Sequence, residues 1–221
     1  MPTLVLVTCR HVAAARGREL EDCLDLALRA LPPASAVVQL REKDLPPRKL
    51  YTLTQAMLRI TRRYRCPLLI NDRLDVAMAA GADGVHLPES GLPIASAHRL
   101  ARPSGQAFLI GRSVHSADGA GAAARDGADL VLCGPIWPTP SKQALGEPLG
   151  TRELVRAARS VAEANQRCRL FAIGGVRTRD QIREAIAAGA HGVAAIRAWI
   201  EADDPGLAAS ELYAAIADSK P

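Results

Sequence analysis

A segment with one pattern occurs three times, as "AMAAGADGVHL" at 77–87, "AARDGADLVLCG" at 123–134 and "AIAAGAHGVAAI" at 185–196. Each copy reads as the end of an alanine-rich helix, a glycine, and then a short apolar run. Glycine is favoured just after a helix because it adopts the left-handed backbone conformation without a Cβ penalty. A run that is apolar on both faces is typical of a buried parallel strand. The pattern therefore indicates helices that alternate with the strands of a parallel sheet.

The same alternation extends along the whole chain. Strands are expected near 3–8, 36–40, 67–70, 83–87, 107–111, 129–133, 169–173 and 192–196. Helices are expected near 17–31, 47–64, 74–80, 94–102, 117–126, 151–164, 179–188 and 208–218. Strands and helices in this number and order predict a single (β/α)₈ TIM-barrel domain over residues 1–221. A doubly wound open sheet, which shows the same alternation with fewer units, is the structural alternative.

Composition agrees with this fold and narrows the class of protein. Apolar residues make up 48% of the 221 residues but aromatic residues only 3%, so aliphatic side chains must form the core. No apolar stretch is long enough for a membrane span, and the N-terminus lacks a secretory pattern. The scattered cysteines show no paired metal spacing, which favours reduced thiols in a cytoplasmic enzyme. They are Cys9, Cys23, Cys66, Cys133 and Cys168.

The formal net charge of +5 raises the question of an anionic partner. The most basic stretch, "RITRRYR" at 59–65, falls late in a predicted helix, where a solvated basic face is the simpler interpretation. We therefore expect no nucleic acid and no membrane as partners, and small anionic substrates instead. The sequence does not reveal the oligomeric state, and a homo-oligomer is one of the alternatives.

Polar residues gather where the predicted strands end, and active sites of such barrels lie at that edge. Strand two ends in Gln39, Arg41 and Lys43, which alternate and so share one face if the chain stays extended. Strand three ends in Asn71 and Asp72. The later strand ends carry His86, Ser113 and His115, then Thr139, Ser141 and Lys142 in the proline-rich loop 134–150, then Gly174, Gly175 and Arg197.

These residue types suit two anion sites. Three cations, Arg41, Lys43 and Lys142, together with the carboxylate of Asp72, suit a pyrophosphate bound with Mg²⁺. Mg²⁺ keeps several waters and takes one or two carboxylates plus phosphate oxygens.

A separate phosphate monoester suits the glycine pair Gly174 and Gly175, whose backbone N–H groups can approach it closely. The hydroxyls of Thr139 and Ser141 would add hydrogen bonds. Two anion sites that face each other imply two phosphorylated substrates.

Simpler structural explanations stand beside these. Asn71 and Asp72 are good helix N-caps and would then only cap the next helix. The glycine pair at 174–175 would be only a tight turn, and His86 only a core histidine. Cys133 is expected to be packing material.

Seven motifs, in order along nearly the whole chain, resemble those of the thiamine phosphate synthase family, which also contains the thiazole tautomerases. They are "QLREK" (39–43), "NDR" (71–73), "GADGVHL" (81–87), "GRSVHS" (111–116), "GPIWPTPSK" (134–142), "AIGGV" (172–176) and "GVAAI" (192–196).

The resemblance implies a (β/α)₈ barrel that joins a hydroxymethylpyrimidine pyrophosphate to a thiazole phosphate, releasing pyrophosphate and forming thiamine phosphate. It assigns the pyrimidine pyrophosphate to Gln39, Arg41, Lys43, Asn71, Ser113 and Lys142. It assigns the thiazole phosphate to Thr139, Ser141, Gly174, Gly175 and the backbone of Ile196 and Arg197. It makes Asp72 the Mg²⁺ ligand. Stabilising the charge that grows on the leaving pyrophosphate is the catalytic role expected of Arg41, Lys43 and Lys142, with Ser113 among the catalytic residues as well.

Two positions depart from the family pattern. Gly91 stands where synthases usually have a second Mg²⁺-binding aspartate, and Glu89 is close enough in sequence to replace it. Arg197 stands where synthases usually have serine. Two alternatives therefore remain beside the synthase. One is a thiazole tautomerase, an isomerase that would use His115 as acid and base, and the other is a non-catalytic protein that binds thiamine precursors.

Overall fold

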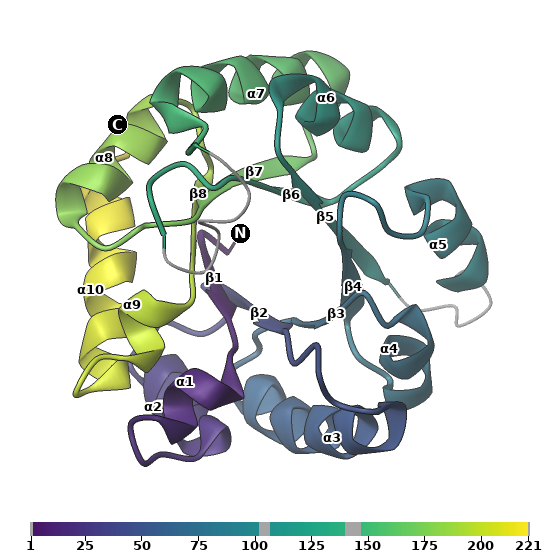
Figure 1. Ribbon diagram of the computed structural model, residues 1–221, viewed down its shortest axis with the longest axis vertical. Helices are drawn as coiled ribbons and strands as arrows, with labels where there is room; N and C mark the ends of the chain where they lie inside the picture. The colour runs from purple at the N-terminus through teal and green to yellow at the C-terminus, as the bar shows by residue number, and fades with distance from the viewer. Residues whose placement is uncertain (1, 102–106, 140–146, 221) are drawn as a thin grey trace.

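The structure is a computed structural model that describes residues 2–101, 107–139 and 147–220. The strands form a closed parallel barrel in chain order, with helices around its outside (Figure 1). The barrel closes where β1 pairs with β8, for example Leu4 with Val193. The predicted (β/α)₈ barrel is therefore confirmed, and the open sheet is wrong.

The bounds of the elements follow the sequence-based expectation closely. The strands are β1 (Leu4–Val7), β2 (Ala36–Leu40), β3 (Leu68–Asn71), β4 (Gly84–Leu87), β5 (Leu109–Val114), β6 (Leu130–Cys133), β7 (Arg169–Ile173) and β8 (Gly192–Ala195). The helices are α1 (Arg10–Ala14), α2 (Leu20–Arg29), α3 (Pro47–Arg63), α4 (Leu74–Ala80), α5 (Ile94–Ala101), α6 (Ala117–Arg125), α7 (Gly150–Ala164), α8 (Arg179–Ala187), α9 (Arg197–Ile200) and α10 (Pro205–Asp218).

The three repeated segments have the expected local structure. Gly81, Gly127 and Gly189 follow α4, α6 and α8, with φ values of +67°, +94° and +92°. Backbone in this left-handed region favours glycine. Each glycine therefore ends one helix and turns the chain into the next strand.

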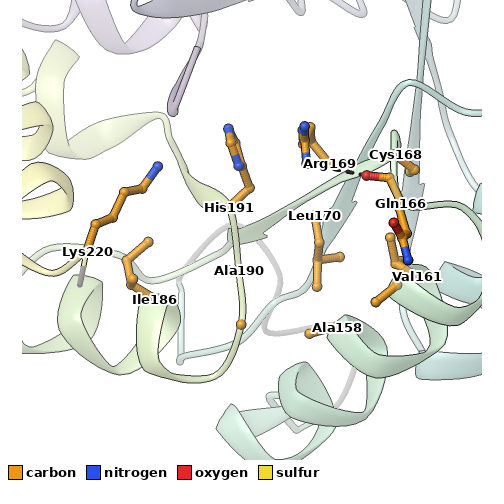
Figure 2. A pocket seen from close by; sticks show the side chains of 12 residues that line it. Ala158, Val161, Gln166, Cys168, Arg169, Leu170, Ile186, Ala190, His191 and Lys220 are labelled. Atoms are coloured by element: carbon orange, nitrogen blue, oxygen red, sulfur yellow. Dashed lines mark hydrogen bonds between the residues drawn. The ribbon is translucent and has the colours of Figure 1, made fainter. Parts of the chain in front are cut away.

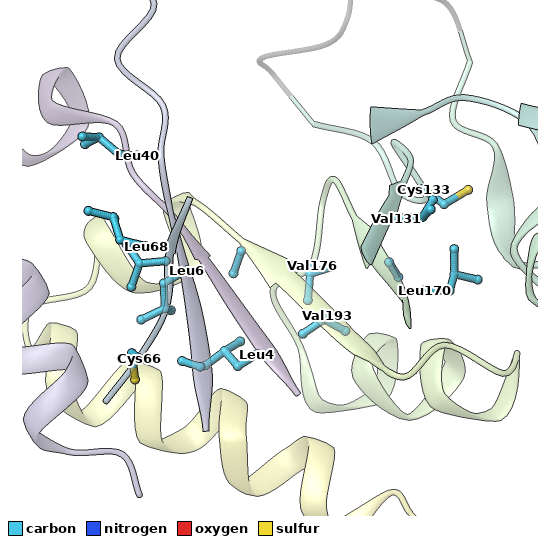
Figure 3. Packing of buried hydrophobic residues seen from close by; sticks show 14 of the residues in the cluster. Leu4, Leu6, Leu40, Cys66, Leu68, Val131, Cys133, Leu170, Val176 and Val193 are labelled. Atoms are coloured by element: carbon cyan, nitrogen blue, oxygen red, sulfur yellow. The ribbon is translucent and has the colours of Figure 1, made fainter. Parts of the chain in front are cut away.

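Successive residues of each strand alternate between two apolar cores. In β1, Leu4 and Leu6 pack between the barrel and its helices, whereas Val5 and Val7 belong to the core inside the barrel. Figure 3 shows part of the outer core, including Leu4, Leu6 and Leu68. Truncating one of these buried leucines to alanine costs about 2–5 kcal/mol in such a core.

Further features of the structure concern the membrane and the cysteines. No described helix is long and apolar enough to cross a membrane. All five cysteines are free thiols. Cys133 is fully buried in the outer core, as expected of packing material.

Candidate active site

Two polar side chains inside the barrel join β2 to β3 near the carboxyl ends of these strands. Gln39 is 3% exposed, and its Nε2 donates a hydrogen bond of 3.0 Å to Asn71 Oδ1. Gln39 Oε1 is buried and has no hydrogen-bond partner among the residues that the structure describes. An unpaired buried carbonyl costs roughly 1–3 kcal/mol, which a ligand that donates a hydrogen bond would recover.

The interpretation of Asn71 and Asp72 as mere helix caps is wrong. Arg73 is the N-cap residue of α4, and no side chain makes a capping hydrogen bond there. Asn71 Oδ1 accepts from Gln39 instead. Asp72 takes a left-handed backbone conformation with φ +65°, and its N–H donates to the carbonyl of His86 at 2.8 Å.

A second polar pair joins β4 to β5. His86 is 1% exposed, and its Nε2 lies 2.9 Å from Ser113 Oγ. Burial, followed by the charges of Arg112 and Arg41, lowers the pKa of His86 to about 3. Gly111 makes room for the ring, since a Cβ there would lie 2.3 Å from His86 Nδ1. His86 is thus a buried, neutral histidine, as a core residue would be, but it also fixes a predicted site residue.

The predicted cations at the end of β2 lie near Asp72. β2 ends at Leu40, so Arg41 and Lys43 belong to the following loop and not to an inward-facing strand as expected. The charge of Arg41, then burial, lowers the pKa of Lys43, and the charge of Asp72 opposes this. Arg41 also lowers the pKa of His86. The carboxyl ends of β2, β3 and β4 therefore share one electrostatic environment.

Asp72 fits a magnesium site of the open type. Its exposed carboxylate makes no hydrogen bond or ion pair with another described residue. Within the described part of the chain, no group of three or more His, Cys, Asp or Glu side chains could hold a metal ion. A single available carboxylate matches Mg²⁺, which binds largely through water and substrate phosphate oxygens.

The position of the second aspartate of the family leaves little room for a side chain. A Cβ on Gly91 would lie 2.8 Å from the Pro88 side chain. Glu89 is engaged by His115, whose backbone N–H donates to Oε1 at 3.1 Å and whose Nδ1 lies 2.7 Å from Oε2. The structure therefore places Glu89 with a histidine, and Asp72 remains the available carboxylate.

Two charged residues that hold the loops of this edge were missed in the sequence. Glu42 is 5% exposed and accepts hydrogen bonds from Thr8 Oγ1 at 2.7 Å and from the N–H of Arg10 at 3.0 Å. Arg112 is 8% exposed and donates to the carbonyls of Pro88 at 2.6 Å and Leu92 at 2.8 Å. Both lie inside motifs used above. Arg112 is next to Ser113 in β5, and the alternation of side chains along a strand directs it to the opposite face.

The prediction for β5 was wrong in its end point. The strand was expected to stop at 111 but continues to Val114, so Ser113 belongs to the strand itself. Its pairing explains this, because Arg112 pairs with Leu87 of β4 and Ser113 with Leu132 of β6. His115 follows directly, 39% exposed at its side chain.

The glycine pair after β7 lies against the loop after β6. A Cβ on Gly174 would come within 2.6 Å of Pro135, and one on Gly175 within 2.7 Å of Trp137. Two hydrogen bonds join the loops: Ile136 N–H donates to Ile173 O and Trp137 N–H to Gly174 O, both at 3.0 Å. The backbone N–H of Gly175 has no acceptor among the described residues. The glycine pair therefore forms a tight turn, as the simpler structural explanation predicted. The N–H of Gly175 is also available to donate to an anion.

Arg197 follows β8, and its guanidinium forms an ion pair with Glu201, one helical turn further on. Arg177, from the β7–α8 loop, lies 3.6 Å from the same carboxylate. Ile196 is the N-cap residue of α9 and makes no side-chain cap. The side chain of Arg197 is thus held by an acid, while its backbone lies at the carboxyl end of β8.

The proline-rich loop carries the remaining predicted residues. Ser141 and Lys142 lie outside the described residues. Thr139 is partly buried and has an interaction partner. Both ends of the loop are fastened, since the N–H of Leu149 donates to Pro135 O at 2.8 Å and that of Gly150 to Ile136 O at 3.1 Å.

Cationic and polar groups of this kind can bind anions and stabilise a leaving group. Comparisons with known proteins show which family the chain belongs to. The family model described as thiamine monophosphate synthase matches residues 4–199. A Geobacter sulfurreducens protein with a provisional name as a thiamine-phosphate synthase is 47% identical, over 96% of this chain and 93% of that protein. The thiamine-phosphate synthase of Methanoculleus marisnigri is 43% identical over 89% of each chain.

A solved structure gives the same result. The thiamine phosphate pyrophosphorylase of Pyrococcus furiosus superposes with a TM-score of 0.84 and 29% identity, covering 99% of this chain and 97% of that one. The resemblance stated from the motifs is therefore confirmed, and the chain belongs to the thiamine monophosphate synthase family.

Proposed function

We propose that this chain is a thiamine-phosphate synthase, a transferase that joins hydroxymethylpyrimidine pyrophosphate to thiazole phosphate. The observation that carries the proposal is the gathering of Arg41, Lys43 and an available Asp72 carboxylate beside two polar pairs at one barrel edge. The relatives named above carry the same activity in their names. A Mg²⁺ requirement, a cytoplasmic location and the absence of nucleic-acid or membrane partners belong to this proposal as predictions.

In the proposed reaction, the bond between the pyrimidine methylene carbon and a pyrophosphate oxygen breaks, and the thiazole nitrogen then forms the new carbon–nitrogen bond. Arg41 and Lys43 neutralise the charge that grows on the leaving pyrophosphate. Mg²⁺, held by Asp72 and the phosphate oxygens, would add further positive charge there. Gln39 Oε1 accepts a hydrogen bond from the pyrimidine substrate, which satisfies its unpaired oxygen.

The second substrate is held at the ends of β7 and β8. The thiazole phosphate accepts hydrogen bonds from the backbone of the Gly174–Gly175 turn and of Ile196–Arg197. In this position its ring nitrogen faces the pyrimidine methylene carbon. No general base is required, because the attacking nitrogen carries a lone pair and no proton.

The experiment that tests the proposal supplies both phosphorylated precursors with Mg²⁺ and measures pyrophosphate and thiamine phosphate. We expect the two products in equal amounts, and a loss of both when Mg²⁺ is chelated. Absence of pyrophosphate above background, with folded protein, would remove the synthase function.

A tautomerase is the second candidate, and one contact favours it. Glu89 holds His115 at 2.7 Å, and a carboxylate that orients an imidazole is a common acid–base arrangement. If this function held, His115→Ala would abolish double-bond migration in carboxythiazole phosphate, followed by ultraviolet absorbance or NMR. Wild-type protein that binds both phosphorylated precursors but turns over neither them nor carboxythiazole phosphate would instead be a non-catalytic binding protein.

A further inference from the structure

A cavity of about 470 Å³ lies at the opposite end of the barrel from the predicted site. It is bounded by the last turns of α7 and α8, the first residues of β7, the residues just before β8, and Lys220 after α10. Figure 2 shows Lys220, His191 and Arg169 in a row along one side, with Ile186 and Val161 on the other. Cavities of this volume hold small molecules in proteins.

The charged side of this cavity carries three basic residues, and one of them, Arg169, already donates a hydrogen bond of 3.4 Å to the carbonyl of Gln166. None of the described residues that line it is aspartate or glutamate. Burial and the charge of Arg169 lower the pKa of Lys220. Burial, followed by the charges of Lys220 and Arg169, lowers the pKa of His191 to about 4. Basic groups that lower one another's pKa in this way are stabilised in their charged form when an anion lies between them.

A comparison of the three repeated segments shows that only the third copy has a basic residue where the other two have aspartate. Asp83 and Asp129 occupy one repeat position, and their Oδ2 atoms accept hydrogen bonds from the N–H of Leu68 at 2.8 Å and of Ile110 at 2.7 Å. The third copy has His191 at this position. A residue that would carry negative charge is thus replaced by one that can carry positive charge.

The contacts of His191 leave one ring nitrogen for a ligand. Its Nε2 lies 3.1 Å from the carbonyl oxygen of Pro2, which can only accept, so Nε2 carries the proton. The ring also packs edge-on against Phe171, with centroids 5.6 Å apart. No other described residue makes a hydrogen bond with the ring, so Nδ1 is available and, on taking up a proton, would donate to an anion.

The opposite wall is apolar. Val161 and Ala158 of α7, Ile186 of α8 and Leu170 of β7 line it. Burying an alkyl chain of a few carbons against such a wall contributes about 0.8 kcal/mol per methylene. The ligand that fits has an anionic head and a short apolar tail.

We propose that this cavity is a second ligand site, which binds a small amphiphilic anion between the Lys220–His191–Arg169 row and the apolar side chains of α7 and α8. The site is separate from the predicted catalytic edge, because β7 runs from Arg169 at the cavity to Ile173 at that edge. Four residue steps along a strand span about 13 Å.

The test uses n-butyl phosphate as the probe, with inorganic phosphate and n-butanol as the two partial ligands, in calorimetric titrations. We expect butyl phosphate to bind more tightly than either, since it alone satisfies both walls. Lys220→Gln is expected to weaken this binding about tenfold. Lys49→Gln removes one positive charge at an exposed position of α3, and we expect it to leave the affinity for butyl phosphate unchanged.

Two further measurements locate the probe. Ala162→Leu places a larger side chain at the cavity wall and should weaken butyl phosphate more than inorganic phosphate. NMR titration of the His191 imidazole should show its pKa rising when butyl phosphate is present. Equal affinity in wild type, Lys220→Gln and Lys49→Gln, or a His191 pKa that does not respond, would overturn the proposal. Thermal melts of each variant verify that it is folded.

Discussion

Aspartates at the two ends of the barrel, Asp83 and Asp129 at one end and Asp72 at the other, have opposite surroundings. At the amino ends of the strands, Asp83 and Asp129 accept hydrogen bonds from backbone N–H groups of neighbouring strands. At the carboxyl ends, Asp72 is exposed and unpaired among the described residues, next to the charges of Lys43 and Arg41. A carboxylate that is fully hydrogen-bonded stabilises the fold, whereas one left available near cations can bind ligands. The same side chain thus serves stability at one end and, in our proposal, catalysis at the other.

Asp72→Asn is the change with the largest expected effect. It keeps the size of the side chain but removes the charge that would bind Mg²⁺, and we expect kcat/KM for pyrophosphate release to fall about 100-fold. The free energy of unfolding should change by less than about 0.5 kcal/mol, because the side chain has no described partner to lose.

Asp180→Asn changes an exposed acid of α8 whose ion pair in the described part of the chain is with Arg183. It is the matched control and should retain full activity. A stability loss in Asp72→Asn as large as its activity loss would show that Asp72 is structural, and the contrast between the two ends would fail.

Asp129→Ala tests the other end. It leaves the N–H of Ile110 without its 2.7 Å acceptor, so we expect the free energy of unfolding to fall by about 2 kcal/mol in denaturant titrations. The specific activity of the folded fraction should stay near that of wild type. Lost activity with unchanged stability would contradict the structural role.

The smallest effect concerns His86. The unfolded chain takes up this proton near pH 6.5, but the folded protein does so only near pH 3, so protonation favours unfolding between these values. The free energy of unfolding of the wild type should therefore decrease as pH drops through this range. In His86→Gln the decrease between pH 6 and 5 should be smaller by about 1 kcal/mol.

His191, with a pKa of about 4, gives a similar slope of its own in both proteins, so the difference between them is what counts. Parallel pH profiles for the two proteins would mean that folding does not lower the pKa of His86.

Much of the fold could be predicted because the sequence repeats its local signals. β2 and β7 have the predicted bounds, since an apolar run ends there in turn residues. α1 was missed: it has five residues and no side-chain cap, so neither periodicity nor capping reveals it. The end of β5 was misjudged because polar residues continue a strand that its neighbours pair.

For the candidate site, the sequence allowed us to predict residues at the strand ends but not the contacts between them. The rule that barrel sites lie at strand ends found Gln39, Asn71 and Ser113, but not the pairs they form. Pairing depends on register between strands that are far apart in sequence, as when Asn71 pairs with His86. Arg112 and Glu42 were missed for the same reason, because their partners belong to other loops.

In the proposed synthase, the pyrophosphate that the reaction releases binds at the carboxyl ends of the strands. The most direct measurement is an NMR titration of ¹⁵N-labelled protein with pyrophosphate and Mg²⁺. We expect saturable shifts at the backbone N–H groups of Asn71, Asp72 and Ser113, and none at those of Asp83 and Asp129. Shifts confined to the amino ends of the strands would contradict this expectation.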